Sequence, residues 1–438
     1  MSLRRSLPVP AAPAAGFPSS SALVPPLLVG EHFATALVCF VCGALGLVVA
    51  AGDIAGGHFY VPRVAGVVHL FTLGWIMLSI FGALCQFLPV AVGKSIWSFK
   101  LAHASFALQV LGVAALVVGL FTNSRFALFA GAASLTLAFW SFGVNLALTL
   151  LGSKQREFTY FALAAATVSL FATPVYGVLL AVYMHHGGLL DPFAIIAHHA
   201  HVAVMGVVLL VMVGVAHRLM PMFLLTHGIS ERPAWAALAL LFSASLLVIV
   251  HDVVQLFAGD LLGGTALTVA GALGCAGVLA MAAQAALFYR GRKKRLIDAG
   301  MSLAAAALLM LLAAAAMAPF ALSRGVGEPH LLVTYFVLLL GAITLFVAAH
   351  YYKIVPFLVW NHRYGPFLGK RKVPKVADLY SMPLAYLNAA VFVSALITVA
   401  LGAYFDSRAV VTTGGLAFVL GATLEAAVMA RIARRKVT

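Results

Sequence analysis

Charged side chains are scarce in this sequence: 9% of its 438 residues are Asp, Glu, Lys or Arg, and only twelve of those are acidic. Soluble globular proteins carry about 25% charged residues, so a soluble enzyme is excluded. Hydrophobic residues instead make up 63% of the chain, and the mean hydropathy is +1.08. Such an excess of apolar residues is typical of chains embedded in lipid. The sequence therefore predicts an integral membrane protein.

Cysteine is also rare. The four residues, Cys39, Cys42, Cys85 and Cys275, all lie in apolar runs. Cys39 and Cys42 form a CxxC pair, but no second pair accompanies it, so we expect structural thiols and no metal or redox pair. The chain contains no CxxCH sequence, which excludes a covalently attached c-type haem in these residues.

Twelve apolar stretches are each about 20 residues long, which is enough to cross about 30 Å of hydrocarbon. They lie at 33–52, 64–90, 101–121, 126–151, 158–184, 193–216, 234–257, 262–289, 299–320, 330–352, 382–404 and 410–430. We therefore expect an all-α membrane protein with twelve transmembrane helices in a single membrane domain, 29–438. Residues 1–28 are rich in Pro, Ala and Ser and lack the compact apolar run of a signal peptide, so they are predicted to be a disordered tail.

Positive charge is distributed unevenly between the two sides of these spans. If the amino terminus lies inside, 23 of the 27 Lys and Arg residues fall in inner segments, and only Arg63, Arg125, Arg324 and Arg408 fall in outer ones. Because cytoplasmic loops carry the excess of Lys and Arg, both termini are predicted to be cytoplasmic, in a bacterial-type inner membrane. Topology thus explains the net charge of +15, and no nucleic-acid partner is expected.

The second and sixth spans share a pattern of glycine and proline. After His69, glycines follow at offsets of 5 and 13 and a proline at 20; after His201 the same offsets give Gly206, Gly214 and Pro221. In the tenth span, Gly341 and Pro356 keep the spacing, and Phe336 takes the histidine's place. Glycine and proline are common in membrane helices, but the even spacing in span number predicts three four-helix repeats, at about 29–152, 153–290 and 291–438.

Histidine is abundant, with fifteen residues, and several lie within the predicted spans. An ionisable side chain at that depth is costly and marks a functional site by default. His69, His199 and His201 all lie about 10 Å from the outer end of their helices, and His251 lies in the outer third of the seventh span. Because thiolate and carboxylate ligands are scarce, ligation by imidazole alone favours haem iron, copper or both.

The HxH sequence at 199–201 has a defined geometry. On an α-helix its two histidines are about 200° apart, so His199 and His201 face opposite sides and can serve two neighbouring cofactors. His198 and His201 share one face. The alternative for each is a hydrogen-bonded packing histidine, and the histidines near the inner ends of the spans, His217, His227, His350 and His362, are expected to reach toward the headgroups.

Together these residues resemble the catalytic subunit of the haem–copper oxidases and nitric oxide reductases. His69 on the second span matches that family's low-spin haem ligand. The string that looks like the family's HxH helix comprises Ala197, His198, His199, Ala200, His201, Gly206, Gly214, His217, Pro221 and Phe223. The family carries this helix as its tenth span, whereas here it is the sixth.

The resemblance implies one or two b-type haems. His69 and His201 would be the axial ligands of one, and His199 would bind a second, five-coordinate haem with His198 or His251 beside its open side. Copper is left open, because only His251 and Asp252 occupy a place comparable to the family's copper ligands. The electron donor would be a quinol or a cytochrome c, and small accessory subunits are expected.

Three function classes follow. The first is an oxidoreductase that reduces O2 or NO. The second is a non-catalytic haem protein in electron transfer, gas sensing, or haem or copper handling. The third is a twelve-helix transporter, which is disfavoured because carriers commonly use inverted repeats, whereas these copies run in the same direction.

Overall fold

The computed structural model describes residues 24–187, 191–258 and 264–435, and within them the chain is helical without strands. Most of the predicted tail, residues 1–23, lies outside these ranges. Twelve helical spans are long and apolar enough to cross a membrane, which makes this a multi-pass membrane protein. They are formed by α1 (Pro26–Val49); α3 (Pro62–His69), η2 (Leu70–Met77) and α4 (Leu78–Ala91) together; α5 (Phe99–Thr122); α6 (Arg125–Leu151); α7 (Phe158–His186); α8 (Pro192–His201), η3 (Val202–Leu209) and α9 (Leu210–Leu224) together; α10 (Arg232–Ala258); α11 (Thr265–Arg290); α12 (Ala299–Arg324) with η4 (Gly325–Gly327); α13 (Pro329–Arg363); α14 (Met382–Tyr404); and α15 (Arg408–Arg434).

The number and order of spans agree with the sequence prediction, while some helix ends differ. Helix α1 begins at Pro26, so the last residues assigned to the tail are helical. Helix α13 continues to Arg363, beyond the predicted end at 352, because Pro356 is accommodated inside the helix. Short helices connect the spans: α2 (Ala51–Ala55), η5 (Gly365–Phe367) and η6 (Val376–Leu379).

The ends of the spans carry the expected helix-starting residues. Proline occupies the first turn of α1, α3, α8, α13 and α14, where its missing N–H is not needed. The side chains of Ser98, Ser124, Asp191, Asp298 and Ser407 each accept a hydrogen bond from a first-turn amide. Such caps satisfy amides that no helical carbonyl can reach.

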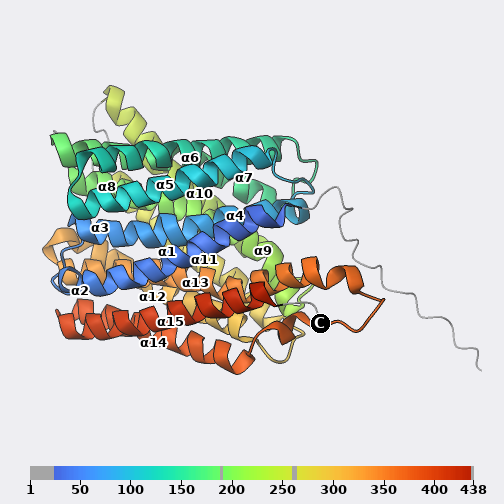
Figure 1. The fold of residues 1–438 in the computed structure, drawn as a ribbon. Coiled ribbons are helices and arrows are strands. Elements are labelled where there is room, and N and C mark those ends of the chain that lie inside the picture. Colours follow the sequence, from blue (N-terminus) through green and yellow to red (C-terminus); the bar gives the residue numbers. More distant parts are fainter. Residues whose placement is uncertain (1–23, 188–190, 259–263, 436–438) are drawn as a thin grey trace, which may run out of the picture.

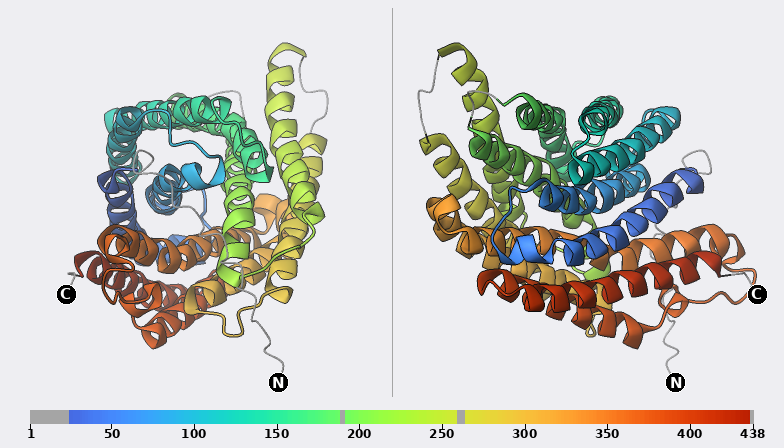
Figure 2. Two further views of the ribbon diagram at one scale, coloured as in Figure 1. Left: turned by 90° about the vertical axis from the view of Figure 1, so that its right-hand side faces the viewer. Right: turned by 60° about the vertical axis from the view of Figure 1, so that its left-hand side comes forward.

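The helices lie side by side, with α5, α6 and α7 along one side of the bundle and α14 and α15 along the other (Figure 1). Seen from one end (Figure 2, left), the second span lies inside a ring of helices and packs against α1, α5 and α13. The second, sixth and tenth spans are the most buried of the twelve. They form the core of the bundle and position the site described below.

Neighbouring spans approach closely through glycine. In the α5–α6 hairpin, a Cβ atom on Gly119 would lie 2.5 Å from the backbone nitrogen of Leu128. The α14–α15 hairpin has the same feature at Gly402, whose Cβ would lie 2.6 Å from the nitrogen of Val411. Since lipid supplies no hydrophobic driving force between helices, such small residues allow the close packing that holds membrane helices together.

Two core spans leave α-helical geometry directly after a histidine. The π-helical segment η2 follows His69, and the π-helical segment η3 follows His201; each is eight residues long. The tenth span, which has Phe336 at the corresponding position, is α-helical throughout. The α-helical periodicity assumed from the sequence therefore fails at these two places. π-helical turns are rare and frequently occur at functional sites.

Candidate functional site

A large apolar cavity lies between the second, sixth and tenth spans, with further lining from α7 and α11. Its volume is about 1350 Å³, and it extends from Pro62 and Pro192 at one end of the bundle down to Met77 and Val208. Binding cavities for small molecules are usually about 300–1,000 Å³ and mostly apolar. The cavity is therefore large enough for a cofactor-sized ligand. Its lining includes His69, His199 and His201.

His69 lies at the end of α3 and is held in one orientation by its own helix. Its Nδ1–H donates to the backbone carbonyl of Ala65, at 2.7 Å. This bond fixes the tautomer and leaves Nε2 as the ring atom with a free lone pair. Histidines that bind metals nearly always donate their other ring N–H to a carbonyl or carboxylate in this way.

His199 faces His69 from the neighbouring core span. The two ring centroids are 6.4 Å apart and the ring planes differ by 25°. Nδ1 of His199 is buried and has no hydrogen-bond partner within the described residues, although the ring lies beside the Thr173 carbonyl. Gly177 of α7 leaves room next to it, since a Cβ there would lie 3.7 Å from Cε1 of His199. The site thus contains two opposed imidazoles on separate helices.

His201 lies on the other side of the same helix, as the HxH spacing predicts. Its Nε2–H donates to the Ala244 carbonyl of α10, at 3.2 Å. Within the described residues its ring makes no contact with that of His69. His201 was expected opposite His69, but His199 takes that place, because the helix turns His199 toward the second span and His201 toward α10.

The two histidines assigned to a second metal are brought together by a carboxylate. Nδ1 of His198 lies 3.0 Å from Oδ2 of Asp252, and Nδ1 of His251 lies 3.2 Å from Oδ1. The Tyr176 hydroxyl donates to Oδ2 at 2.6 Å. In the ranges the structure describes, no three His, Cys, Asp or Glu side chains are grouped to hold a metal ion. The arrangement is a hydrogen-bonded network on α7, α8 and α10, next to the cavity but not part of its lining.

Two other buried histidines, His350 and His32, were not predicted from the sequence to lie inside the bundle. His350 was expected near the headgroups, yet it is buried and its Nδ1–H donates to the Phe346 carbonyl at 2.7 Å. The extension of α13 to Arg363 explains this, because it places His350 well inside the span. His32 of α1 is fully buried with the same kind of bond to Leu28. The sequence did not predict a role for His32, and only its position in an apolar run could have indicated one.

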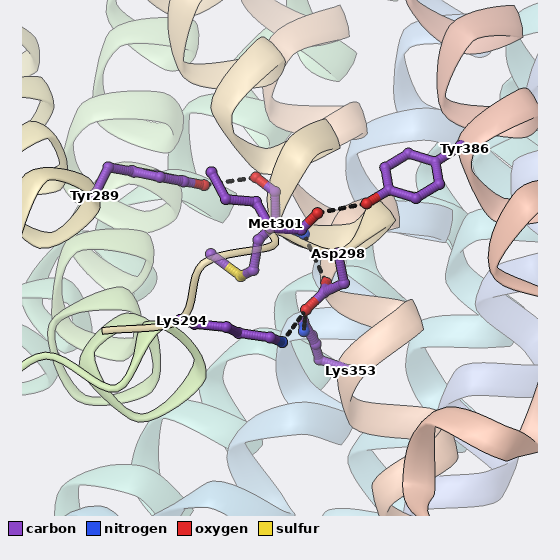
Figure 3. A network of polar contacts seen from close by, with 7 residues as sticks. Tyr289, Lys294, Asp298, Met301, Lys353 and Tyr386 are labelled. Carbon is purple, nitrogen blue, oxygen red and sulfur yellow. Dashed lines mark hydrogen bonds and ion pairs between the residues drawn. The ribbon is translucent and has the colours of Figure 1, made fainter. Parts of the chain in front are cut away.

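A second polar cluster, centred on Asp298, lies where α12 begins (Figure 3). Lys294 and Lys353 both form ion pairs with its Oδ2 atom, the former at 2.7 Å. Tyr289 donates to the Met301 carbonyl at 2.6 Å. Burial raises the pKa of Asp298, but hydrogen bonds from the two lysines outweigh it, so the pKa is held below its ordinary value. The cluster fixes the 291–298 loop to α13.

Comparison with known proteins adds no family to this description. No protein-family model matches the chain, and no curated protein matches it in sequence. The function must therefore be inferred from the geometry of the site.

Proposed function

We propose that the chain binds a b-type haem in the central cavity, with His69 and His199 as its axial ligands, and that it is a membrane redox protein. The observation that carries this proposal is the pair of opposed imidazoles, 6.4 Å apart, at the wall of an apolar cavity of about 1350 Å³. Of the functions considered from the sequence, electron transfer fits this pair best.

The separation of the two rings fits a metal between them. If a metal lay between the two rings, each metal–nitrogen bond would be about 2.0 Å long. Adding the distance from each nitrogen to its ring centre gives a separation of about 6 Å between the ring centroids, close to the 6.4 Å in the structure. The orientation of His69 also fits, because its Nδ1–H is bound to Ala65 and its Nε2 is available. The buried Nδ1 of His199 has no hydrogen-bond partner among the described residues, so ligation of a bound metal would satisfy it.

A bound haem would supply one-electron redox chemistry. The chain's own residues hold it and set its surroundings: the two histidines fix its position, and the apolar lining excludes water. If His69 and His199 both held the haem iron, no coordination position would be left for O2 or NO. We therefore favour the non-catalytic class over the gas-reducing class. The electron donor, a quinol or a cytochrome c, and accessory subunits stay predictions.

The test is an absorption spectrum of the purified full chain and of four single variants. We expect His69→Ala and His199→Ala each to lose the low-spin spectrum while still inserting into the membrane. His201→Ala should keep it, because its imidazole is engaged by Ala244. His350→Ala is a matched control, since His350 makes the same bond to the preceding turn as His69 but lies outside the cavity lining.

Two results would contradict the proposal. Loss of the low-spin spectrum in His201→Ala with retention in His199→Ala would restore the pairing of His69 with His201. A carbon monoxide shift of the reduced wild-type spectrum would reveal an open coordination position, and it would favour the O2- or NO-reducing class with a second, five-coordinate haem. Metal analysis would then decide whether copper is present beside His198 and His251.

We further infer three four-helix repeats, with both termini cytoplasmic in a bacterial-type inner membrane. The repeat is supported by η2 and η3, which follow His69 and His201 at the same offset, and by the burial of the second, sixth and tenth spans. The orientation is supported by the distribution of Lys and Arg between alternate loops.

A further inference from the structure

A carboxyl group that does not line the central cavity is buried without a hydrogen-bond partner. Glu425 lies on α15, and its side chain is fully buried inside the protein. Neither carboxyl oxygen has a hydrogen-bond partner, and no Lys, Arg or His in the described ranges forms an ion pair with it. Buried carboxyl groups are normally paired or bound to a metal. Glu425 therefore differs from the other acid groups of the spans, Glu31 and Asp252, which are hydrogen-bonded to histidines.

The neighbours of Glu425 are neutral polar groups from two other helices. Tyr351 and Tyr352 of α13 lie within electrostatic range of its carboxyl group. Asn388 of α14 is also fully buried: its Nδ2–H donates to the Tyr352 hydroxyl oxygen at 3.1 Å, while its Oδ1 has no partner. This Oδ1 faces α15 one turn before Glu425, 3.4 Å from where a Cβ on Gly421 would lie.

The unpartnered oxygens of Glu425 and Asn388 indicate whether Glu425 is ionised or protonated. An ionised carboxylate would leave two oxygens and the Oδ1 of Asn388 as acceptors without a donor, inside a membrane where an unpaired charge is expensive. A carboxylic acid adds the missing O–H donor to this group of acceptors. We propose that Glu425, with Asn388 and Tyr352, forms a proton-binding site within the membrane, and that its proton exchanges with water through Tyr352 and Tyr380.

The proposed route leads to the end of the bundle where Asp298 lies. Tyr380 follows η6 in the loop between α13 and α14 and is partly exposed. Its ring centroid lies 5.5 Å from that of Tyr352. Tyr380 therefore lies between the surface and Tyr352, the phenol near Glu425. Ionisable residues inside membrane spans commonly form such proton relays.

On its other side the site continues toward the cavity. The Tyr351 hydroxyl lies 2.8 Å from Oγ of Ser79, which donates to the Trp75 carbonyl. The Trp75 indole N–H lies 3.4 Å from the carbonyl of Thr344, and Thr344 lines the cavity. These contacts connect Tyr351, beside Glu425, to the wall of the cavity in which we propose that haem binds. The proton-binding proposal itself does not rest on haem binding, and its test needs no cofactor.

The experiment is infrared spectroscopy of the purified full chain in H2O and after transfer to D2O. A carboxylic acid has a C=O band that a carboxylate lacks, and this band shifts when its proton is replaced by deuterium. We expect one such band to be absent in Glu425→Gln and unchanged in Glu31→Gln, whose carboxylate is bound to His103 at 2.6 Å. If Glu425→Gln does not fold, Glu425→Asp gives the same assignment, because it moves the band.

The route is tested by the rate of the deuterium shift. Tyr352→Phe should slow it by about 10²-fold, the effect of removing a proton-transferring side chain. Tyr351→Phe is the matched control on the adjacent residue, and it should leave the rate unchanged because Tyr351 lies on the cavity side. A wild-type band that is missing, that sodium ions abolish, or that never shifts in D2O would overturn the proposal. So would equal rates in the two tyrosine variants.

Discussion

Replacing Asp298 by Asn would remove the carboxylate from the cluster that fixes the 291–298 loop to α13. Its side chain is only 8% exposed, and that of its partner Lys353 is 13% exposed. Removing one member of a buried pair leaves an unpaired charge and costs about 3–5 kcal/mol. The pair with Lys294 adds little, about 0–1 kcal/mol, because that lysine is 37% exposed. Since Asn is also a good N-cap, the bond to the Met301 amide is kept.

The assay is the free energy of unfolding in detergent micelles, measured by denaturant titration. We expect Asp298→Asn to lose about 3–5 kcal/mol, and Asp298→Ala about 1 kcal/mol more, because Ala also removes the helix cap. Lys294→Met should cost about 1 kcal/mol or less. Adding Lys353→Met to Asp298→Asn should restore part of the loss, since no buried charge then remains unpaired. A loss in Asp298→Asn no larger than that in Lys294→Met would refute the reasoning.

Three further predictions follow from other features. The stability contributed by Asp298 is complete above its ordinary pKa of 3.8, and it is lost as the pH falls through the lower pKa of Asp298 in the folded protein. The unfolding free energies of wild type and Asp298→Asn should therefore converge at low pH. Parallel curves would contradict the lowered pKa. Gly119→Ala should destabilise the α5–α6 hairpin by about 1–3 kcal/mol, whereas Gly271→Ala, where a Cβ meets nothing within 4 Å, should be neutral by the same titration. A tag in the 290–295 loop should be reached only from the cytoplasmic side and a tag at 325–327 only from outside; labelling from the reverse sides would show that the orientation is wrong.

The spans could be predicted because lipid imposes a simple rule on sequence. Each crossing needs about 20 apolar residues, and the charge pattern checks the count independently. Helix ends were less certain where no charge marks them: α13 continues through apolar and aromatic residues to Arg363, and proline within a membrane helix does not stop it. The π-helical segments could not be predicted, since Leu70–Met77 and Val202–Leu209 have the same apolar composition as α-helical spans.

The candidate site was predicted in part. Depth along the helix identified His69, His199 and His201, and all three line one cavity. Which of the two HxH histidines faces His69 depends on how the sixth span is rotated against the second, and that rotation is a property of packing between distant residues. The bond between His198 and Asp252 likewise depends on the contact between α8 and α10. Glu425 and Asp252 are the two acid groups within the spans predicted from the sequence, but the sequence does not show that Glu425 lacks a partner.

The π-helical segments have a consequence for how these helices tolerate insertions and deletions. A π turn holds about one residue more than an α turn. Each π-helical segment therefore changes the rotation of one half of its span about the helix axis relative to the other half. The half that carries His69 is turned to aim the imidazole, while the half that follows is turned to set Gly82 against His32. Deleting one residue from 70–77 would remove this rotation and leave a regular α-helix of almost unchanged hydropathy. The chain would still cross the membrane, but the half with His69 would be rotated about the helix axis relative to the half with Gly82. Either His69 or Gly82 would then face the wrong neighbour.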